Sequence, residues 1–531
     1  MKNKVVKALA CTMSVCMLSA SLAGCGNDDG NQSSQGSQGS SDTQQSSQGS
    51  SDTQQSSEGS DAQTPDESQT GGIDKSNGLF PAYDFGGVEL TLLDQNDLGG
   101  HNPDAEGLEE NVKAERQEWK DYIEQKYNVK LTFVPLPTGD WKEIRSEIVA
   151  AYNSGNPIAD IMDAYYQFVG AYVANDMLYD FSEDFANDNT FIKEEYFTWK
   201  GKEWGLSRAI GGEGLYYNME WLQRLGMEKT PAEMFDEGRW SYDDCYNYLL
   251  DMKSKLGADE YPLFVSPSYW MLFAPAANGT IILNPNGNLN YNQDAFIEAM
   301  EFFQKCLDAG LMAVADKDEN GDYNSWNYPS DTYGQQNTVV MTHRAAWQAD
   351  GDKNNFQIGF VPYPWGSNVT IDESKVGEPG AYLTLSENYR SSCFDGQLIC
   401  FLKNITDKVD NPMHLMSMML EFMTWDSSMV AYVPEEETPI NCGWLEDGLD
   451  KDLYRYSVGL QRLEPYNSLK LGLQMHSNIE SILYDGGSIR SSMESYYNAD
   501  MKTMIDNGYA DESVVDDTYV EPEPEAENET E

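Results

Sequence analysis

The chain reads VELTLL at residues 88–93, LEENVKAERQEWKDYIEQKY at 108–127 and VKLTFV at 129–134. The first and third runs are rich in β-branched and apolar residues and predict strands, whereas the middle run has apolar and charged faces at helical spacing. A second helix at 140–152 and a third strand at 158–162 (IADIM) continue the pattern. The order strand, helix, strand, helix, strand predicts an α/β fold.

Ligands of open α/β sheets bind beyond the carboxyl ends of the strands. We therefore expect a ligand near the loops at residues 94–100, 136–141 and 163–168. Short Asx side chains can instead bond their own backbone, and aromatic rings can simply pack in the core. The candidates are Asp94, Asn96 and Asp97 after the first strand, Trp141 after the second, and Asp163, Tyr165 and Tyr166 after the third.

The charge balance excludes several classes of protein. The 531 residues hold 34 basic and 88 acidic side chains, a formal net charge of −54, so nucleic acid and anionic lipid surfaces would be repelled. Only four histidines are available, which leaves little for a zinc site, and we expect no cofactor. The 40% of hydrophobic residues allow a large core over two or three globular units.

The N-terminus has the layout of a secretory signal. Lys2, Lys4 and Lys7 precede an uncharged, mostly apolar run at residues 8–22. The sequence LAGC that follows resembles a bacterial lipobox, which implies removal of residues 1–24 and attachment of lipid to Cys25. An ordinary signal peptide with a chance cysteine is the alternative.

Residues 25–78 are Ser-, Gln- and Gly-rich and contain the tandem decapeptides SDTQQSSQGS (41–50) and SDTQQSSEGS (51–60). This composition offers almost nothing to bury, so it predicts a disordered tether behind the lipid. Residues 519–531 form an acidic tail that is expected to be solvated. The globular part should therefore span residues 79–518.

Five cysteines remain after the signal and Cys25 are set aside. An odd number without CxxC spacing favours buried thiols over a disulfide framework or a catalytic cysteine. The pairing is left open for Cys245, Cys306, Cys393, Cys400 and Cys442.

A series of motifs resembles family 1 extracellular solute-binding proteins, the receptors of ABC importers for sugars and oligosaccharides. The segment EIVAAYNSGNPIADI (147–161) resembles the family's helix-turn-strand, and GKEWGLS (201–207) followed by LYYN (215–218) resembles its crossing segment, with Ser207 in place of a proline. Further matches follow in the family's order. RWSYDD (239–244) resembles a helix start, IGFVPYPWG (358–366) resembles the strand that returns to the family's first lobe, and the other matches lie at 295–311, NTVVMTHRAAW (337–347) and 412–425.

This resemblance implies a two-lobe α/β clamp of the periplasmic-binding-protein kind, with crossing hinge strands, behind the lipidated tether. Lobe one would hold residues 82–212 and 356–430, and lobe two residues 213–355 and 431–518. The implied function is capture of a solute, a sugar or oligosaccharide, by a monomer held on the outer face of the bacterial membrane only through its lipid. Delivery to ABC permease subunits is implied as well, and catalysis is not.

Sugar ligands present C–H faces for aromatic rings and hydroxyls for polar side chains. Tyr165 and Tyr166 align with a ligand-contacting position of the family, and Trp347 matches a tryptophan that the family often stacks on sugar. The set of candidates is completed by Tyr269, Trp270 and Arg344, while Trp204, Trp240 and Trp425 are expected in the core.

A weak metal candidate lies at Asp316, Asp318 and Asn320, which resemble the first half of an EF-hand loop. The twelfth position is Asn327 where a bidentate Glu is needed, so a solvated turn is favoured. Two further classes of protein remain open, a surface scaffold that holds polysaccharide without transport and, much less favoured, a secreted hydrolase with paired carboxylates. Peptides or polyols remain alternative ligands.

Overall fold

A computed structural model gives the structure of the chain. It describes residues 80–94, 101–105, 107–139, 141–186, 196–207, 214–284, 287–319, 321–325, 328, 332–333, 337–393, 397–423, 442, 444–446, 448–463 and 466–510. The expected signal, Cys25, the tether and the acidic tail lie outside the described residues, as do Asn96, Asp97, Asn320 and Trp425.

A six-stranded sheet forms the first part of the fold, in the order β2-β1-β3-β11-β5-β4. Strands β1, β2 and β3 run parallel, whereas β11 is antiparallel to both β3 and β5, and β4 is antiparallel to β5. The bounds are β1 Val88–Asp94, β2 Val129–Phe133, β3 Ile161–Tyr165, β4 Tyr196–Trp199, β5 Lys202–Ser207 and β11 Gln397–Phe401.

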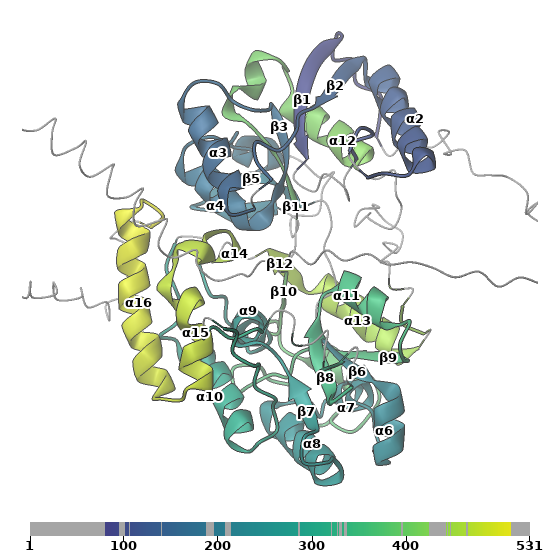
Figure 1. Ribbon diagram of the computed structural model, residues 1–531, viewed down its shortest axis with the longest axis vertical. Helices are drawn as coiled ribbons and strands as arrows, with labels where there is room; N and C mark the ends of the chain where they lie inside the picture. Colours follow the sequence, from purple (N-terminus) through teal and green to yellow (C-terminus); the bar gives the residue numbers. More distant parts are fainter. Residues whose placement is uncertain are drawn as a thin grey trace, which may run out of the picture. The chain divides into compact units, whose positions relative to one another are not determined.

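A four-stranded sheet in the order β7-β8-β6-β9 forms the second part (Figure 1). Strand β7 is parallel to β8, and β6 is antiparallel to both β8 and β9. A separate parallel pair joins β10 to β12. The bounds are β6 Gly214–Asn218, β7 Tyr261–Phe264, β8 Val339–Arg344, β9 Ile358–Val361, β10 Ser391–Cys393 and β12 Gln461–Leu463.

Helices pack around each sheet. Those around the first sheet are α2 Glu110–Tyr127, α3 Trp141–Asn153, α4 Tyr166–Ala174, α5 Ser182–Ala186 and α12 Pro412–Phe422. The helices of the second part are α6 Met219–Leu225, α7 Pro231–Asp236, α8 Tyr242–Lys255, α9 Pro267–Ala277, α10 Asp294–Asp308, α11 Ala346–Asp352, α13 Leu449–Gly459, α15 Gln474–Tyr484 and α16 Ile489–Asp506. The short α14 Tyr466–Leu469 packs against α4 and so links the two parts.

Local sequence explains where several helices begin. Helix α8 has Ser241 as its N-cap, and the Ser241 hydroxyl accepts a hydrogen bond from the Asp244 N–H. Helix α7 has a complete capping box at Thr230 and Glu233 with Pro231 in its first turn. The expected helix start at residues 239–244 is confirmed.

The third strand begins at Ile161, later in the chain than the predicted strand at residues 158–162. Asp160 is held before the strand, because its carboxylate accepts bonds from the Thr91 N–H and hydroxyl, both at 2.8 Å, and pairs with Lys408. The strand therefore runs from Ile161 to Tyr165 and leads directly into α4. The expectation of a loop at residues 163–168 is wrong.

The position of β9 also differs from expectation. Residues 358–366 were expected to return to the first lobe, but β9 pairs with β6 in the four-stranded sheet, where Leu215 lies opposite Val361. After β5, the next strand that the chain contributes to the first sheet is β11. The intervening residues include the short 3-10 helix η3 Ala381–Thr384, which packs on α7.

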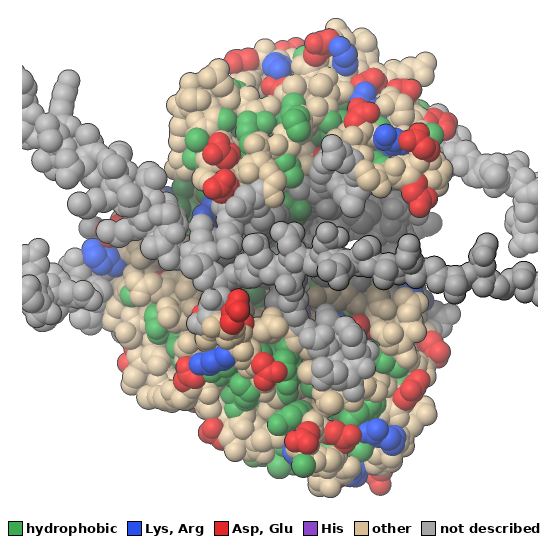
Figure 2. All heavy atoms as spheres, in the orientation of Figure 1, with side chains coloured by type: hydrophobic (Ala, Val, Ile, Leu, Met, Phe, Trp, Pro, Cys, Tyr) green, Lys and Arg blue, Asp and Glu red, His purple; other side chains and the backbone are tan. Residues whose placement is uncertain are grey.

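The surface agrees with the composition. Figure 2 shows acidic side chains spread over the visible face of the described residues, as expected for a chain of net charge −54. Within the described part of the chain, no helix combines the length and apolar character needed to cross a bilayer.

Candidate ligand-binding site

Topology brings the carboxyl ends of the parallel strands to the edges where the chain crosses between sheets. Ser207 at the end of β5 lies opposite Leu398 of β11, and the preceding β11 residue, Gln397, lies opposite Tyr165 at the end of β3. In the second sheet, Gly214 at the start of β6 lies opposite Arg344 at the end of β8. We call these the first edge and the second edge, and ligands of open α/β sheets bind at such places.

Two carboxyl side chains lie next to each other at the first edge. Asp94 and Asp163 are register partners on the parallel strands β1 and β3, so their side chains point to the same face of the sheet. Asp94 is 3% exposed and Asp163 is fully buried, and the His101 N–H donates to Asp94 at 2.9 Å. Burying neighbouring carboxylates costs folding free energy, which makes the pair typical of a functional site.

The tyrosines that follow this edge differ in their surroundings. Tyr165 is partly exposed at the end of β3, with its ring edge-on to Phe168 at 5.9 Å between centroids. Tyr166 is 1% exposed in α4, and its ring lies edge-on to Phe197 at 5.3 Å. Of these two neighbouring rings, only that of Tyr165 is partly exposed.

At the second edge, too, one of two neighbouring aromatic residues is partly exposed and the other is buried. Tyr269 is partly exposed in the first turn of α9, and its ring stacks on His343 of β8 at 4.4 Å. Trp270 is fully buried, and its indole N–H donates to the Ala299 carbonyl at 2.8 Å. Tyr269 can therefore offer a surface to a ligand, whereas Trp270 is part of the core of the second part.

Arg344 is engaged within the protein. It is 3% exposed and forms two hydrogen bonds with the Asp352 carboxylate, from Nε at 2.7 Å and from Nη2 at 3.0 Å. Its charge is thereby compensated inside the fold. Trp141 and Trp347 lie in α3 and α11, but their side chains are outside the described part of the structure.

The buried face of α2 carries a residue that sequence reasoning missed. Arg116 is 6% exposed, shares that face with Trp119, Ile123 and Tyr127, and donates from Nη1 to the Asn102 carbonyl at 3.0 Å. Asn102 and His101 are buried as well and follow the end of β1. A charged residue at apolar helical spacing was the signal that could have revealed this polar cluster.

The described residues of the candidate metal site, Asp316 and Asp318, belong to a turn. Asp318 accepts the Asp322 N–H at 3.0 Å through its side chain and the Gly321 N–H at 3.0 Å through its carbonyl. Among the described residues, no group of three or more His, Cys, Asp or Glu side chains could hold a metal ion. Cys245, Cys306 and Cys400 are buried free thiols, as favoured from the sequence, and Cys442 is buried as well.

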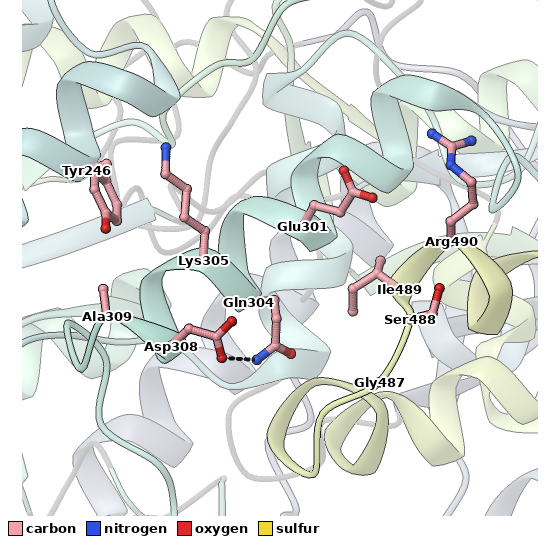
Figure 3. A pocket seen from close by; sticks show the side chains of 10 residues that line it. All are labelled: Tyr246, Glu301, Gln304, Lys305, Asp308, Ala309, Gly487, Ser488, Ile489 and Arg490. Atoms are coloured by element: carbon pink, nitrogen blue, oxygen red, sulfur yellow. Dashed lines mark hydrogen bonds between the residues drawn. The ribbon is translucent and has the colours of Figure 1, made fainter.

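A pocket of about 630 Å³ lies away from both edges, between α10 and the turn before α16 (Figure 3). Lys305 there lies over the Tyr246 ring, 4.2 Å from its centre, and pairs with Asp243. The Gln304 amide donates to Asp308. None of the predicted ligand residues lines this pocket.

Comparisons with known proteins agree with the fold. No curated protein matches the sequence. The sugar-binding protein MalE of Xanthomonas citri is 12% identical with a TM-score of 0.54, covering 79% of this chain and 98% of its own. The galacto-N-biose-/lacto-N-biose I-binding protein of Bifidobacterium longum is 15% identical with a TM-score of 0.53, covering 81% of this chain and 99% of its own.

These similarities confirm the predicted two-lobe α/β fold. The sequence profile of the family described as bacterial extracellular solute-binding protein matches residues 118–420, which is more than half of the chain. The chain therefore belongs to the bacterial extracellular solute-binding protein family.

Proposed function

We propose that the protein captures a sugar or oligosaccharide outside the cell and delivers it to the permease subunits of an ABC importer. The observation that carries this proposal is the set of side chains at the two edges. The buried carboxylates of Asp94 and Asp163 lie side by side on β1 and β3, and the partly exposed rings of Tyr165 and Tyr269 lie at the end of β3 and in the first turn of α9. Carboxylates accept hydrogen bonds from sugar hydroxyls, and aromatic rings cover sugar C–H faces. The names of the structural neighbours, which include sugar-binding proteins, support the same substrate class.

The charges of the described site residues favour an uncharged ligand. Asp94 and Asp163 place acidic groups at the first edge. At the second edge, Asp352 compensates Arg344, and burial lowers the pKa of His343 to about 3, which leaves its ring neutral. A neutral glycan therefore fits these residues better than a uronate or a sugar phosphate.

A thermal-shift screen tests the proposal on the chain carrying Cys25→Ala, against neutral glycans, uronates, sugar phosphates, polyols and peptides. A ligand that binds only the folded state raises the melting temperature. We expect a shift with a neutral glycan and none with its uronate counterpart. Binding restricted to peptides, or hydrolysis of the bound glycan, would contradict the proposal.

Asp163→Asn then tests the site. The substitution keeps the shape of the side chain but weakens hydrogen bonds to ligand hydroxyls, and we expect affinity to fall about tenfold or more. Glu115→Gln, which changes an exposed carboxylate on α2, is the matched control and should bind as the parent does. Equal affinities for all three proteins would remove Asp163 from the site.

We also propose that the protein is anchored through lipid on Cys25. The body is strongly acidic, so electrostatics oppose any other attachment to anionic headgroups. Cys25→Ala should release the protein from the membrane fraction, whereas full retention would contradict a lipid anchor at this residue.

A further inference from the structure

We propose that His343 is a positioning residue that holds the Tyr269 ring in place as a stacking face for the ligand. This inference rests on the proposed capture of a carbohydrate and adds to it the reason why one particular ring of the second edge is set for binding.

Three rings form a compact group at the end of β8. The His343 ring lies 4.4 Å from Tyr269 and 4.6 Å from Phe273, with interplanar angles of 30° and 28°. Tyr269 and Phe273 are one turn apart on α9, with centroids 6.2 Å apart. His343 thus contacts both rings of the helix, although only Tyr269 is partly exposed. Aromatic contacts of this geometry are attractive beyond the area they bury.

The His343 ring is itself fixed on its other side. Its Nδ1 lies 2.9 Å from the Tyr363 hydroxyl, and the Tyr363 carbonyl accepts a hydrogen bond from the Tyr389 hydroxyl at 2.9 Å. The backbone of His343 lies in β8, where it is the register partner of Leu215. An imidazole held by a strand and by a ring-nitrogen contact has little freedom to rotate, so it can fix the ring that stacks on it.

Histidine combines two properties that this position uses. Burial, together with the charge of Arg344, lowers the pKa of His343 to about 3, so the ring is neutral over the physiological range. A neutral imidazole presents a flat face to Tyr269 and a nitrogen to Tyr363. Phenylalanine would supply the face alone, and alanine would supply neither.

The test compares His343→Ala, His343→Phe, Tyr269→Ala and the double variant Tyr269→Ala/His343→Ala, using the neutral glycan found in the screen. We expect Tyr269→Ala to weaken binding about thirtyfold and His343→Ala about tenfold. The double variant should bind no more weakly than Tyr269→Ala alone, because His343 acts through that ring. His343→Phe should bind within about threefold of the parent, although it melts at a lower temperature because Tyr363 loses a hydrogen-bond partner.

A merely structural role would give a different result. If the losses from Tyr269→Ala and His343→Ala add in the double variant, or if His343→Phe binds as weakly as His343→Ala, the inference is overturned. Parent-like binding by Tyr269→Ala would also overturn it, while leaving glycan capture intact. Failure of every glycan to bind would instead count against the proposed function.

A second measurement needs no ligand. Tyrosine side chains labelled with ¹³C report the order of the Tyr269 ring by NMR, with assignment from the spectrum of Tyr269→Ala. In His343→Ala the Tyr269 signals should shift and broaden, and in His343→Phe they should stay close to those of the parent. Unchanged signals in His343→Ala would overturn the positioning role.

Discussion

Arg344 and Asp352, eight residues apart in the chain, form a buried ion pair between the end of β8 and the end of α11. The guanidinium donates from two nitrogens to the two oxygens of one carboxylate, at 2.7 and 3.0 Å, and both residues are at most 6% exposed. A buried guanidinium in this geometry is satisfied by its own partner, which assigns Arg344 to the fold rather than to ligand recognition.

Removal of one partner should therefore destabilise the protein. Asp352→Ala leaves the Arg344 charge buried without compensation, and we expect a loss of about 3–5 kcal/mol in the free energy of unfolding, measured with urea. Replacing both residues with apolar side chains, Arg344→Met together with Asp352→Leu, should cost less than Asp352→Ala alone. An Arg344→Met protein that unfolds normally but no longer binds the glycan would restore Arg344 to the site.

Trp270 should behave as a core residue although its neighbour Tyr269 does not. Trp270→Ala opens a cavity and removes the indole bond to Ala299, so the unfolding free energy should fall by about 3–5 kcal/mol. Trp240, which is also fully buried, is the matched comparison and should lose a similar amount on truncation. Normal melting of Trp270→Ala combined with weakened glycan binding would contradict this assignment.

Glu421 of α12 connects two segments of the first part of the fold. One segment begins at Phe80, just after the predicted tether, and the other is the end of α2. Its buried carboxylate accepts hydrogen bonds from Lys126 at 2.6 and 2.7 Å, from the Tyr127 hydroxyl and from the Phe80 N–H. Glu421→Gln removes the charge while nearly keeping the shape, and we expect a loss of about 2–3 kcal/mol in unfolding free energy.

The Glu421 measurement has an internal control. Tyr127→Phe removes only one donor of the group and should cost about 1 kcal/mol. Protease cleavage near Phe80 should also become faster in Glu421→Gln. An equal unfolding midpoint for parent and Glu421→Gln would show that the network contributes nothing measurable.

Asp500 should give the protein a pH-dependent stability. The carboxylate is fully buried and accepts the Gln474 and Met475 N–H groups at the start of α15, at 2.6 and 2.9 Å. Burial raises the pKa of Asp500 from 3.8 to about 6, so the folded state binds this proton more tightly than the unfolded state. The resulting stabilisation is complete below about pH 4 and is lost as the pH rises through 6, a change of about 3 kcal/mol.

Urea unfolding of the parent and of Asp500→Asn between pH 4 and 7 measures this effect. The difference between the two proteins isolates Asp500, because His343, whose low pKa acts in the opposite direction, is present in both. We expect the advantage of the parent over Asp500→Asn to grow as the pH falls from 7 to 4. A constant difference across this range would contradict a raised pKa.

Much of the fold could be predicted because its signals are local. The β-branched runs that became β1 and β2 differ from the predicted strands by one residue at most, and the Ser241 cap marked the start of α8. Strand propensity, helical periodicity and capping depend on neighbours within a few residues. The sequence by itself therefore determined the α/β class and the order of the first elements.

The positions of the site residues depended on contacts between residues far apart in the chain, which no local sequence pattern can show. Thr91 and Lys408 bind the Asp160 carboxylate, so that β3 begins at Ile161 instead of at residue 158 as predicted. Asp163 therefore lies in the strand and Tyr166 in α4. Sequence alone supplied Asp94, Asp163, Tyr165 and Tyr269 as candidates, but not which of them keep exposed surface.

Tertiary structure alone decided which of two neighbouring residues is buried and which keeps an exposed surface. Tyr269 and Trp270 are adjacent in α9, yet one stacks on His343 at the second edge and the other bonds Ala299 of α10 inside the core. Successive residues of a helix point about 100° apart, so the packing of distant strands and helices determines which of them meets a ligand and which is buried.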